Sequence, residues 1–188
     1  MNCKEGVTYK TLLAMYLTFF TSMTISSFGF FTMIFFFEED FGLSPEKALS
    51  TVSLLLFYGM PFNLISSVFS GYIFNRFGRK KPILAGFLVT LTALLCVPFV
   101  GTIEVVLCLL IVTQITSAWT QNPPLIADYV EPNSIGKAVA MQGLLNALAT
   151  IFAIGVVFDQ TKHLSFQAQI PIFCGLMYVL AAIAVLGI

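Results

Sequence analysis

Six segments of the chain are long and apolar enough to cross a lipid bilayer, and this feature limits the fold more than any other. A helix needs about 20 mostly apolar residues to cross the hydrocarbon core, at a rise of about 1.5 Å per residue. Backbone groups in lipid must find their hydrogen bonds within the protein, so we expect these segments to be helices. They lie near residues 11–37, 48–74, 83–100, 103–122, 137–158 and 168–188. The sequence therefore predicts an all-α integral membrane bundle of six transmembrane helices in a single domain, residues 1–188.

The composition agrees with lipid as the solvent and excludes several classes of function. Of the 188 residues, 58% are hydrophobic and 10% are charged, whereas soluble domains carry about 25% charged residues. The net charge is zero, which argues against nucleic acid as a partner. We find no catalytic Ser-His-Asp set, paired carboxylate, metal-ligand spacing or phosphate-binding loop. We expect neither an enzyme nor a bound cofactor or metal.

The distribution of Lys and Arg predicts the orientation. With six spans, both termini and the second and fourth loops share one side of the membrane. That side holds seven of the nine cations: Lys4, Lys10, Arg76, Arg79, Lys80, Lys81 and Lys137. Cations gather in cytoplasmic loops of membrane proteins. We therefore expect the termini on the cytoplasmic side, or on the matrix side in a mitochondrion.

Uncharged polar residues recur at helical spacing within four of the spans. We list as possible cavity-lining residues Thr18, Ser22, Ser26, Asn63, Gln114, Gln121, Asn122, Gln142 and Asn146. Spacing of about four residues places each set on one helix face. The first, second, fourth and fifth spans would then surround a polar cavity, with the third and sixth facing lipid. For Ser and Thr, bonding to the preceding turn is the simpler alternative. For Asn and Gln, cavity lining and bonding between helices both remain open.

The loop between the second and third spans resembles the signature loop of the major facilitator superfamily. It reads GYIFNRFGRKKPI, and the matching positions are Gly71, Ile73, Arg76, Gly78, Arg79, Lys80 and Ile83. The later stretch PLIADYVEPNSIGKAVAMQG is similar to the family's loop between the fourth and fifth helices. The resemblance implies half of a major facilitator fold, which is a 3+3 inverted repeat.

The resemblance also implies roles for residues on the inner side. Gly71 would permit close contact of helix ends, and Gly78 a tight or left-handed turn. Arg76, Arg79 and Lys80 would pair with helix C-termini, lipid phosphate or carboxylates of the later inner loop, whose candidate residues are Asp128, Glu131 and Lys137. The family's usual Asp in the signature loop is Asn75 here, so the charge that would contact a second half is missing.

Two functions follow from this resemblance. The first is a transporter half that moves a small polar solute by facilitated diffusion, because no charged residue lies deep within any span to carry a proton. It would act with a second six-helix half, as a homodimer or with a separate chain, or as part of a longer chain. The alternative is a non-transporting accessory subunit of a larger membrane complex, for example an organellar or respiratory assembly.

Overall fold

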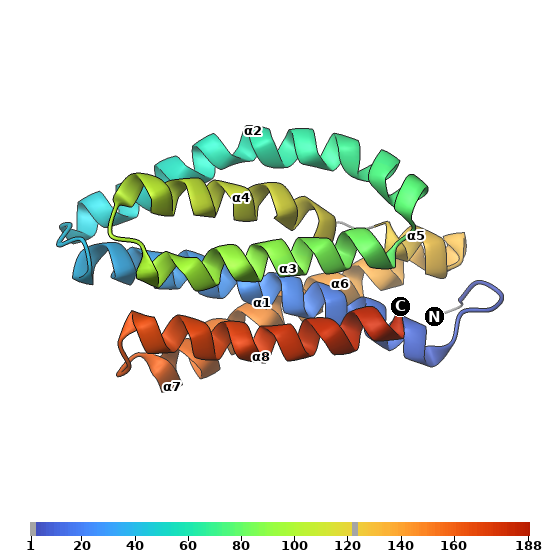
Figure 1. Cartoon of the computed structure of the whole chain (residues 1–188). Helices are drawn as coiled ribbons and strands as arrows, with labels where there is room; N and C mark the ends of the chain where they lie inside the picture. Colours follow the sequence, from blue (N-terminus) through green and yellow to red (C-terminus); the bar gives the residue numbers. More distant parts are fainter. Residues whose placement is uncertain (1–2, 122–123) are drawn as a thin grey trace.

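The computed structural model of the protein describes residues 3–121 and 124–188 (Figure 1). Within these residues, six helical spans are long and apolar enough to cross a membrane. The first four are α1 (Tyr9–Glu39), α2 (Pro45–Phe77), α3 (Lys80–Cys96) with the short 3-10 turn η1 (Val97–Phe99), and α4 (Ile103–Gln121). A connection containing α5 (Leu125–Tyr129) and η2 (Pro132–Ser134) leads to α6 (Ile135–Ile151). The fifth span continues through η3 (Phe152–Phe158) and α7 (Asp159–Thr161), and α8 (Phe166–Gly187) is the sixth. The protein is an integral multi-pass membrane protein.

Local sequence explains where the first helices begin and end. Thr8 precedes α1, and its hydroxyl accepts a hydrogen bond from the amide of Thr11 at 3.3 Å, which satisfies one free donor of the first turn. Pro45 opens α2 at a position where its missing N–H costs nothing. Gly78 follows the last residue of α2 with a φ of 75°. That positive value suits glycine, and Gly78 and Arg79 turn the chain tightly, since α3 begins at Lys80.

Two helices depart from regular α geometry. Pro61 lies inside α2, where it removes one backbone hydrogen bond and crowds the preceding turn. Helix α2 bows outward along its length in Figure 1. The fifth span changes from α to π geometry at Phe152–Phe158, which widens the helix at the segment that packs against α1.

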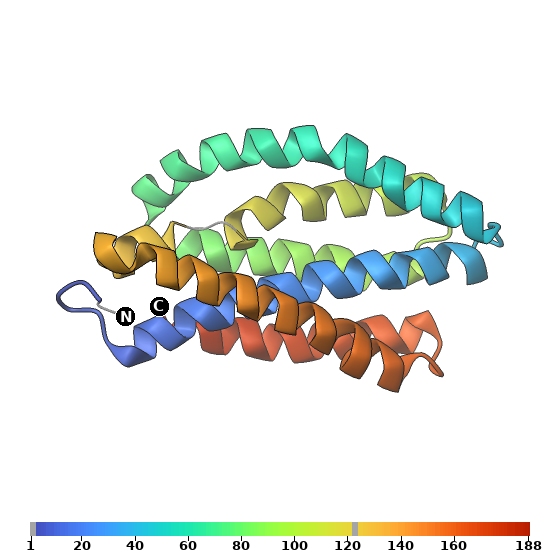
Figure 2. The same ribbon diagram turned by 180° about the vertical axis from the view of Figure 1, so that it is seen from behind.

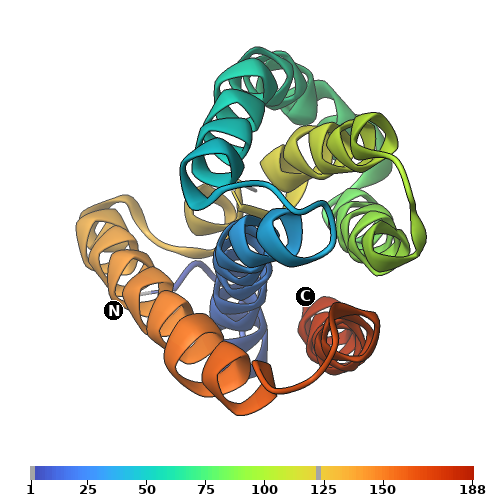
Figure 3. The same ribbon diagram turned by 90° about the vertical axis from the view of Figure 1, so that its left-hand side faces the viewer.

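Helix α1 is the centre of the bundle. It contacts α2 and α4 on one side and α6 and α8 on the other, as the end-on view in Figure 3 shows. Helix α4 contacts α2 and α3, and α3 contacts α8. Exchanging the first three spans with the last three converts the α1–α6 contact into α4–α2, and α1–α8 into α4–α3. This pattern fits the inverted repeat of a major facilitator half.

Phenylalanine side chains form several of the contacts that α1 makes with the fifth span and α8. Phe28 stacks on Phe173 of α8 with ring centroids 3.7 Å apart. Phe20 lies against Phe152 of η3 at 5.7 Å, and Figure 2 shows α6 running alongside α1. Aromatic pairs of this kind contribute about 0.5–1.5 kcal/mol beyond the area that they bury.

Glycine lets α4 approach both of its neighbours closely. A Cβ atom at Gly86 of α3 would lie 2.8 Å from Cγ2 of Thr120 and 3.3 Å from the carbonyl oxygen of Thr116. A Cβ atom at Gly59 of α2 would lie 2.9 Å from Cγ of Gln114. Small residues at helix contacts are a main means of association in membranes, where the hydrophobic effect between helices is absent.

We expect Gly86→Ala to destabilise the bundle, because the added methyl group overlaps Thr120 and the backbone of α4. Overpacking of this kind costs about 1–3 kcal/mol. The control is Gly143→Ala in α6, where a Cβ atom would meet nothing within 4 Å. Alanine's higher helix propensity should leave that variant unchanged or stabilised by up to about 1 kcal/mol. The measurement is the midpoint of thermal unfolding in mild detergent. Equal midpoints for the two variants would contradict the close α3–α4 contact.

Candidate functional site

The turn between α2 and α3 is joined to the α4–α6 connection by an ion pair. Nε of Arg79 lies 2.5 Å from Oδ2 of Asp128, and Nη2 donates to Oδ1 at 3.1 Å. The two side chains are 26% and 31% exposed. The guanidinium also lies over the ring of Phe74, 5.8 Å from its centroid. Of the candidate carboxylates in this connection, Asp128 is the one that meets Arg79.

The N-terminal segment holds the same short helix, α5, from the other side. The amide of Lys4 donates to the carbonyl of Tyr129 at 3.0 Å. Nζ of Lys4 donates to the carbonyl of Ala127 at 2.7 Å. Cys3 and Val130 form an isolated antiparallel bridge. Helix α5 is therefore fixed between the signature loop and the N-terminal segment, at the end of the bundle where both termini lie (Figure 1).

The other residues named in these two loops form no ion pair with Arg79 or Asp128. Nη1 of Arg76 donates to the Tyr72 hydroxyl at 2.9 Å. The remaining named residues are exposed or half-buried, with no ion pair in the described part of the chain: Asn75, Lys80, Glu131 and Lys137. Gly71 differs from the expectation of close helix contact, because a Cβ atom there would meet nothing within 4 Å. Gly71 itself is exposed.

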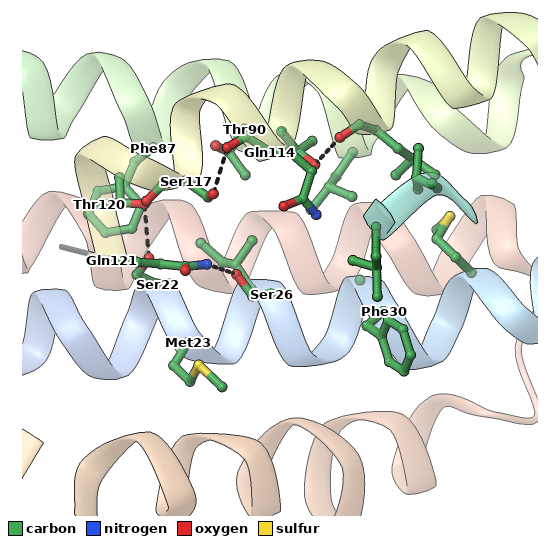
Figure 4. A pocket seen from close by; sticks show the side chains of 18 of the residues that line it. Ser22, Met23, Ser26, Phe30, Phe87, Thr90, Gln114, Ser117, Thr120 and Gln121 are labelled. Carbon is green, nitrogen blue, oxygen red and sulfur yellow. Dashed lines mark hydrogen bonds between the residues drawn. The ribbon is translucent and has the colours of Figure 1, made fainter. Parts of the chain in front are cut away.

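A cavity of about 260 Å³ lies between α1, α2, α3 and α4. Its polar lining side chains are all uncharged: Ser22, Ser26, Thr90, Thr113, Gln114, Ser117, Thr120 and Gln121. Its apolar lining includes Ile25, Phe30, Met33, Leu55, Leu56, Phe87, Leu94 and Leu110. Most of the polar groups come from α4 and face α1, as Figure 4 shows.

Helix α4 bonds to α1 and α3 through the polar side of this cavity. The Ser22 hydroxyl donates to Oγ1 of Thr120 at 2.9 Å. Nε2 of Gln121 donates to the Ser26 hydroxyl at 2.5 Å (Figure 4). On the α3 side, the hydroxyls of Thr90 and Thr116 lie 2.7 Å apart. Hydrogen bonds between membrane helices contribute about 0.6 kcal/mol on average.

Helix α2 is bonded to α4 as well. Nδ2 of Asn63 donates to the Gln114 carbonyl at 2.9 Å and to Oγ of Ser117 at 2.8 Å. The Ser66 hydroxyl donates to the carbonyl of Ile115 at 2.7 Å. Asn63 thus bonds helices together and is not among the cavity-lining residues.

The structure gathers four of the residues singled out in the sequence and leaves the others elsewhere. Ser22, Ser26, Gln114 and Gln121 line the cavity. The Thr18 hydroxyl donates to the carbonyl of Ala14, one turn back in its own helix, at 2.9 Å. Gln142 and Asn146 are half-buried on α6, on the other side of α1 from the cavity. Asn122 lies outside the described residues.

The third span differs from the expectation that it faces lipid. Phe87, Thr90 and Leu94 of α3 line the cavity, and no lining residue comes from the fifth span. The cause is the close contact at Gly86, which draws α3 against α4. The sequence contains a pattern that predicts this contact: Gly86 and Thr90 are four residues apart, the spacing that small residues show at contacts between membrane helices.

Comparison with known proteins supports the same family as the loop motifs. The family model of the Major Facilitator Superfamily matches residues 3–154 of the 188-residue chain. The match includes the signature loop, the α4–α6 connection and all four helices around the cavity. Neither the comparison with curated proteins nor that with solved structures gives a match.

We expect the Arg79–Asp128 pair to give a measurable coupling energy in a double-mutant cycle of Arg79→Gln and Asp128→Asn. A bidentate, partly buried pair should give about 1 kcal/mol, falling as salt is added. The control cycle uses Lys162 and Asp159, a pair whose side chains are 61% and 52% exposed. That exposed pair should give no more than about 0.5 kcal/mol. The measurement is thermal unfolding of the four variants of each cycle, and additive effects at Arg79 and Asp128 would contradict the coupling.

Proposed function

Because the chain belongs to the major facilitator superfamily, we propose that it is a transporter half that moves a small polar solute by facilitated diffusion. The family consists typically of transporters rather than enzymes. The observation that carries the proposal is the cavity between α1, α2, α3 and α4, with eight uncharged polar residues in its lining. An uncharged lining suits a neutral solute, because a charged one would lose its water without gaining an opposite charge.

The proposed transporter requires a second six-helix half. Two helices are poorly covered by the rest of the bundle. In its most apolar part, α2 has 22% of its residues buried and the fifth span has 17%, whereas α1 has 61%. These two helices lie on either side of α1 and leave one face of the bundle uncovered (Figure 3). A second half packed there would convert the cavity into a site between two halves, open alternately to each side. It can be a further part of the same protein, a second copy or a separate chain.

A specific observation also favours the alternative, a non-transporting subunit of a larger membrane complex. The side chains of Ser22, Asn63, Ser66 and Thr90 are bonded to other helices of the bundle. They therefore stabilise the fold whether or not a solute binds. In this alternative, the exposed apolar surfaces of α2 and α6 would pack against other subunits.

We infer that the end of the bundle with both termini faces the cytoplasm, or the matrix in a mitochondrion, because seven of the nine cations belong to it. The test uses a chain in which Cys3, Cys96, Cys108 and Cys174 are replaced by alanine. In sealed right-side-out vesicles, a membrane-impermeant maleimide should label a Lys162→Cys variant at once. A Lys80→Cys variant should react only after the vesicles are permeabilised. Labelling in the reverse order would overturn the orientation.

We expect the purified chain in liposomes to exchange a neutral solute, measured by counterflow across a panel of hexoses, polyols and short primary amides. The exchange should not depend on a pH gradient. Leu56→Trp should lower it at least tenfold, because Leu56 lines the cavity and the larger side chain fills it.

The matched control is Leu176→Trp on α8, which is exposed, lies outside the cavity and is not on the helices against which the second half would pack. It should keep the exchange rate of the unmodified protein. No exchange of any panel member, together with recovery of the chain only in a larger native assembly by native mass spectrometry, would favour the accessory subunit and overturn the transporter.

A further inference from the structure

We propose that the cavity between α1, α2, α3 and α4 binds a small neutral solute whose polar head both donates and accepts hydrogen bonds and whose short body is apolar. A primary carboxamide with a short alkyl chain has this chemistry. The head would be recognised by the carboxamides of Gln114 and Gln121. This inference rests on the proposed function, since it names the class of solute for the same cavity.

Several polar groups that line the cavity already form hydrogen bonds within the protein. The hydroxyl of Ser22 bonds to Thr120, and that of Thr90 to Thr116. The hydroxyl of Ser117 donates to the carbonyl of Gln114 in its own helix at 2.8 Å. These hydroxyls are engaged within the protein, so they contribute little to a solute.

Gln114 differs from these hydroxyls. Its carboxamide has no hydrogen-bond partner among the described residues, while its backbone carbonyl accepts from Asn63 and Ser117. The start of its side chain packs where Gly59 has no Cβ atom, so the stem is held in place. Figure 4 shows the side chain extending from α4 toward α1, into the cavity. Gln114 is half-buried and its carboxamide opens into the cavity, so its donors and acceptor are available to a solute.

Gln121 supplies a second group on the same side of the cavity. Its Nε2 donates to Ser26, which fixes the side chain between α4 and α1 (Figure 4). The bond leaves its carbonyl oxygen able to accept. Gln114 and Gln121 stand seven residues apart, two helical turns, and so share one face of α4. Together they offer both donors and acceptors, which matches a head that has both.

The other wall of the cavity determines the body of the solute. Phe30, Met33, Leu55 and Leu56 line it from α1 and α2, and they offer contacts to an apolar chain. The volume of about 260 Å³ is below the range of about 300–1,000 Å³ of drug-sized sites. A short chain fits this space. A carboxylate or ammonium head would be disfavoured, because no opposite charge lines the cavity to replace its water.

The test measures binding of hexanamide to the purified full chain in lipid nanodiscs, by the rise in unfolding temperature with ligand concentration. Hexanoate and hexylammonium are the charged counterparts of similar length. We expect an apparent Kd for hexanamide at least tenfold lower than for either. Gln114→Leu should raise the Kd for hexanamide at least tenfold. The fold does not depend on this side chain's polar group, because that group bonds to no other described residue.

The matched control is Gln142→Leu on α6, outside the cavity, which makes the same chemical change and should leave the Kd unchanged. Hexanamide that dissolves in the lipid would affect this variant and Gln114→Leu equally, so the comparison of the two removes that effect. Equal shifts for the three ligands, or a Gln114→Leu variant that binds as the unmodified protein does, would overturn the proposal. If hexanamide binding depends on Gln114 but no solute is exchanged in liposomes, the binding site is supported and the transport function is overturned. If solute is exchanged and Gln114→Leu does not affect the exchange, transport is supported and the binding site is overturned.

Discussion

In a bilayer the apolar side chains of separated helices are already solvated by lipid, so burying them against one another gives little driving force for folding. This bundle depends instead on hydrogen bonds and close backbone contact, and both converge on α4. Helix α4 bonds to α1 through Thr120, to α2 through Ser117, and to α3 through Thr116. Gly59 and Gly86 bring α2 and α3 close enough to α4 for the second and third of these bonds to form. The position of α4 therefore decides where the other three helices of the cavity lie.

The same helix also determines what the cavity can offer a solute. A polar side chain on α4 either bonds to a neighbouring helix or remains available in the cavity, and the structure contains both kinds. Thr120 and Ser117 belong to the first kind, and the carboxamide of Gln114 to the second. A transporter half and a purely structural subunit would share the bonded residues. They would differ in whether the free carboxamide of Gln114, which is half-buried and opens into the cavity, has a solute to bind.

The six spans and the turn at Gly78 could be predicted from the sequence, because hydropathy and glycine's freedom at positive φ are local properties. The ion pair of Arg79 with Asp128 is one of a few pairings that the charges of the two loops predict. The composition of the cavity wall could not be predicted in the same way. Periodicity says that Gln142 and Asn146 share a face of their helix, but not which neighbour that face meets. The wall instead includes Thr90, and Asn63 bonds to α4, because Gly86 and Gly59 set how closely the helices approach.

The strength of the contacts at the end of the bundle that holds both termini is compatible with a protein that changes conformation. The Arg79 and Asp128 side chains are 26% and 31% exposed. Exposed pairs contribute about 0–1 kcal/mol, whereas breaking a buried pair costs about 3–5 kcal/mol, and we expect this partly buried pair to lie near the weaker end, at about 1 kcal/mol. A contact that opens in each cycle must be of the weaker kind, since thermal motion has to break it repeatedly. This contact lies near the cavity along the chain, because α4 ends at Gln121 and the following short helix α5 carries Asp128. In the proposed transporter, a solute that displaces α4 would therefore act close to the Arg79–Asp128 pair.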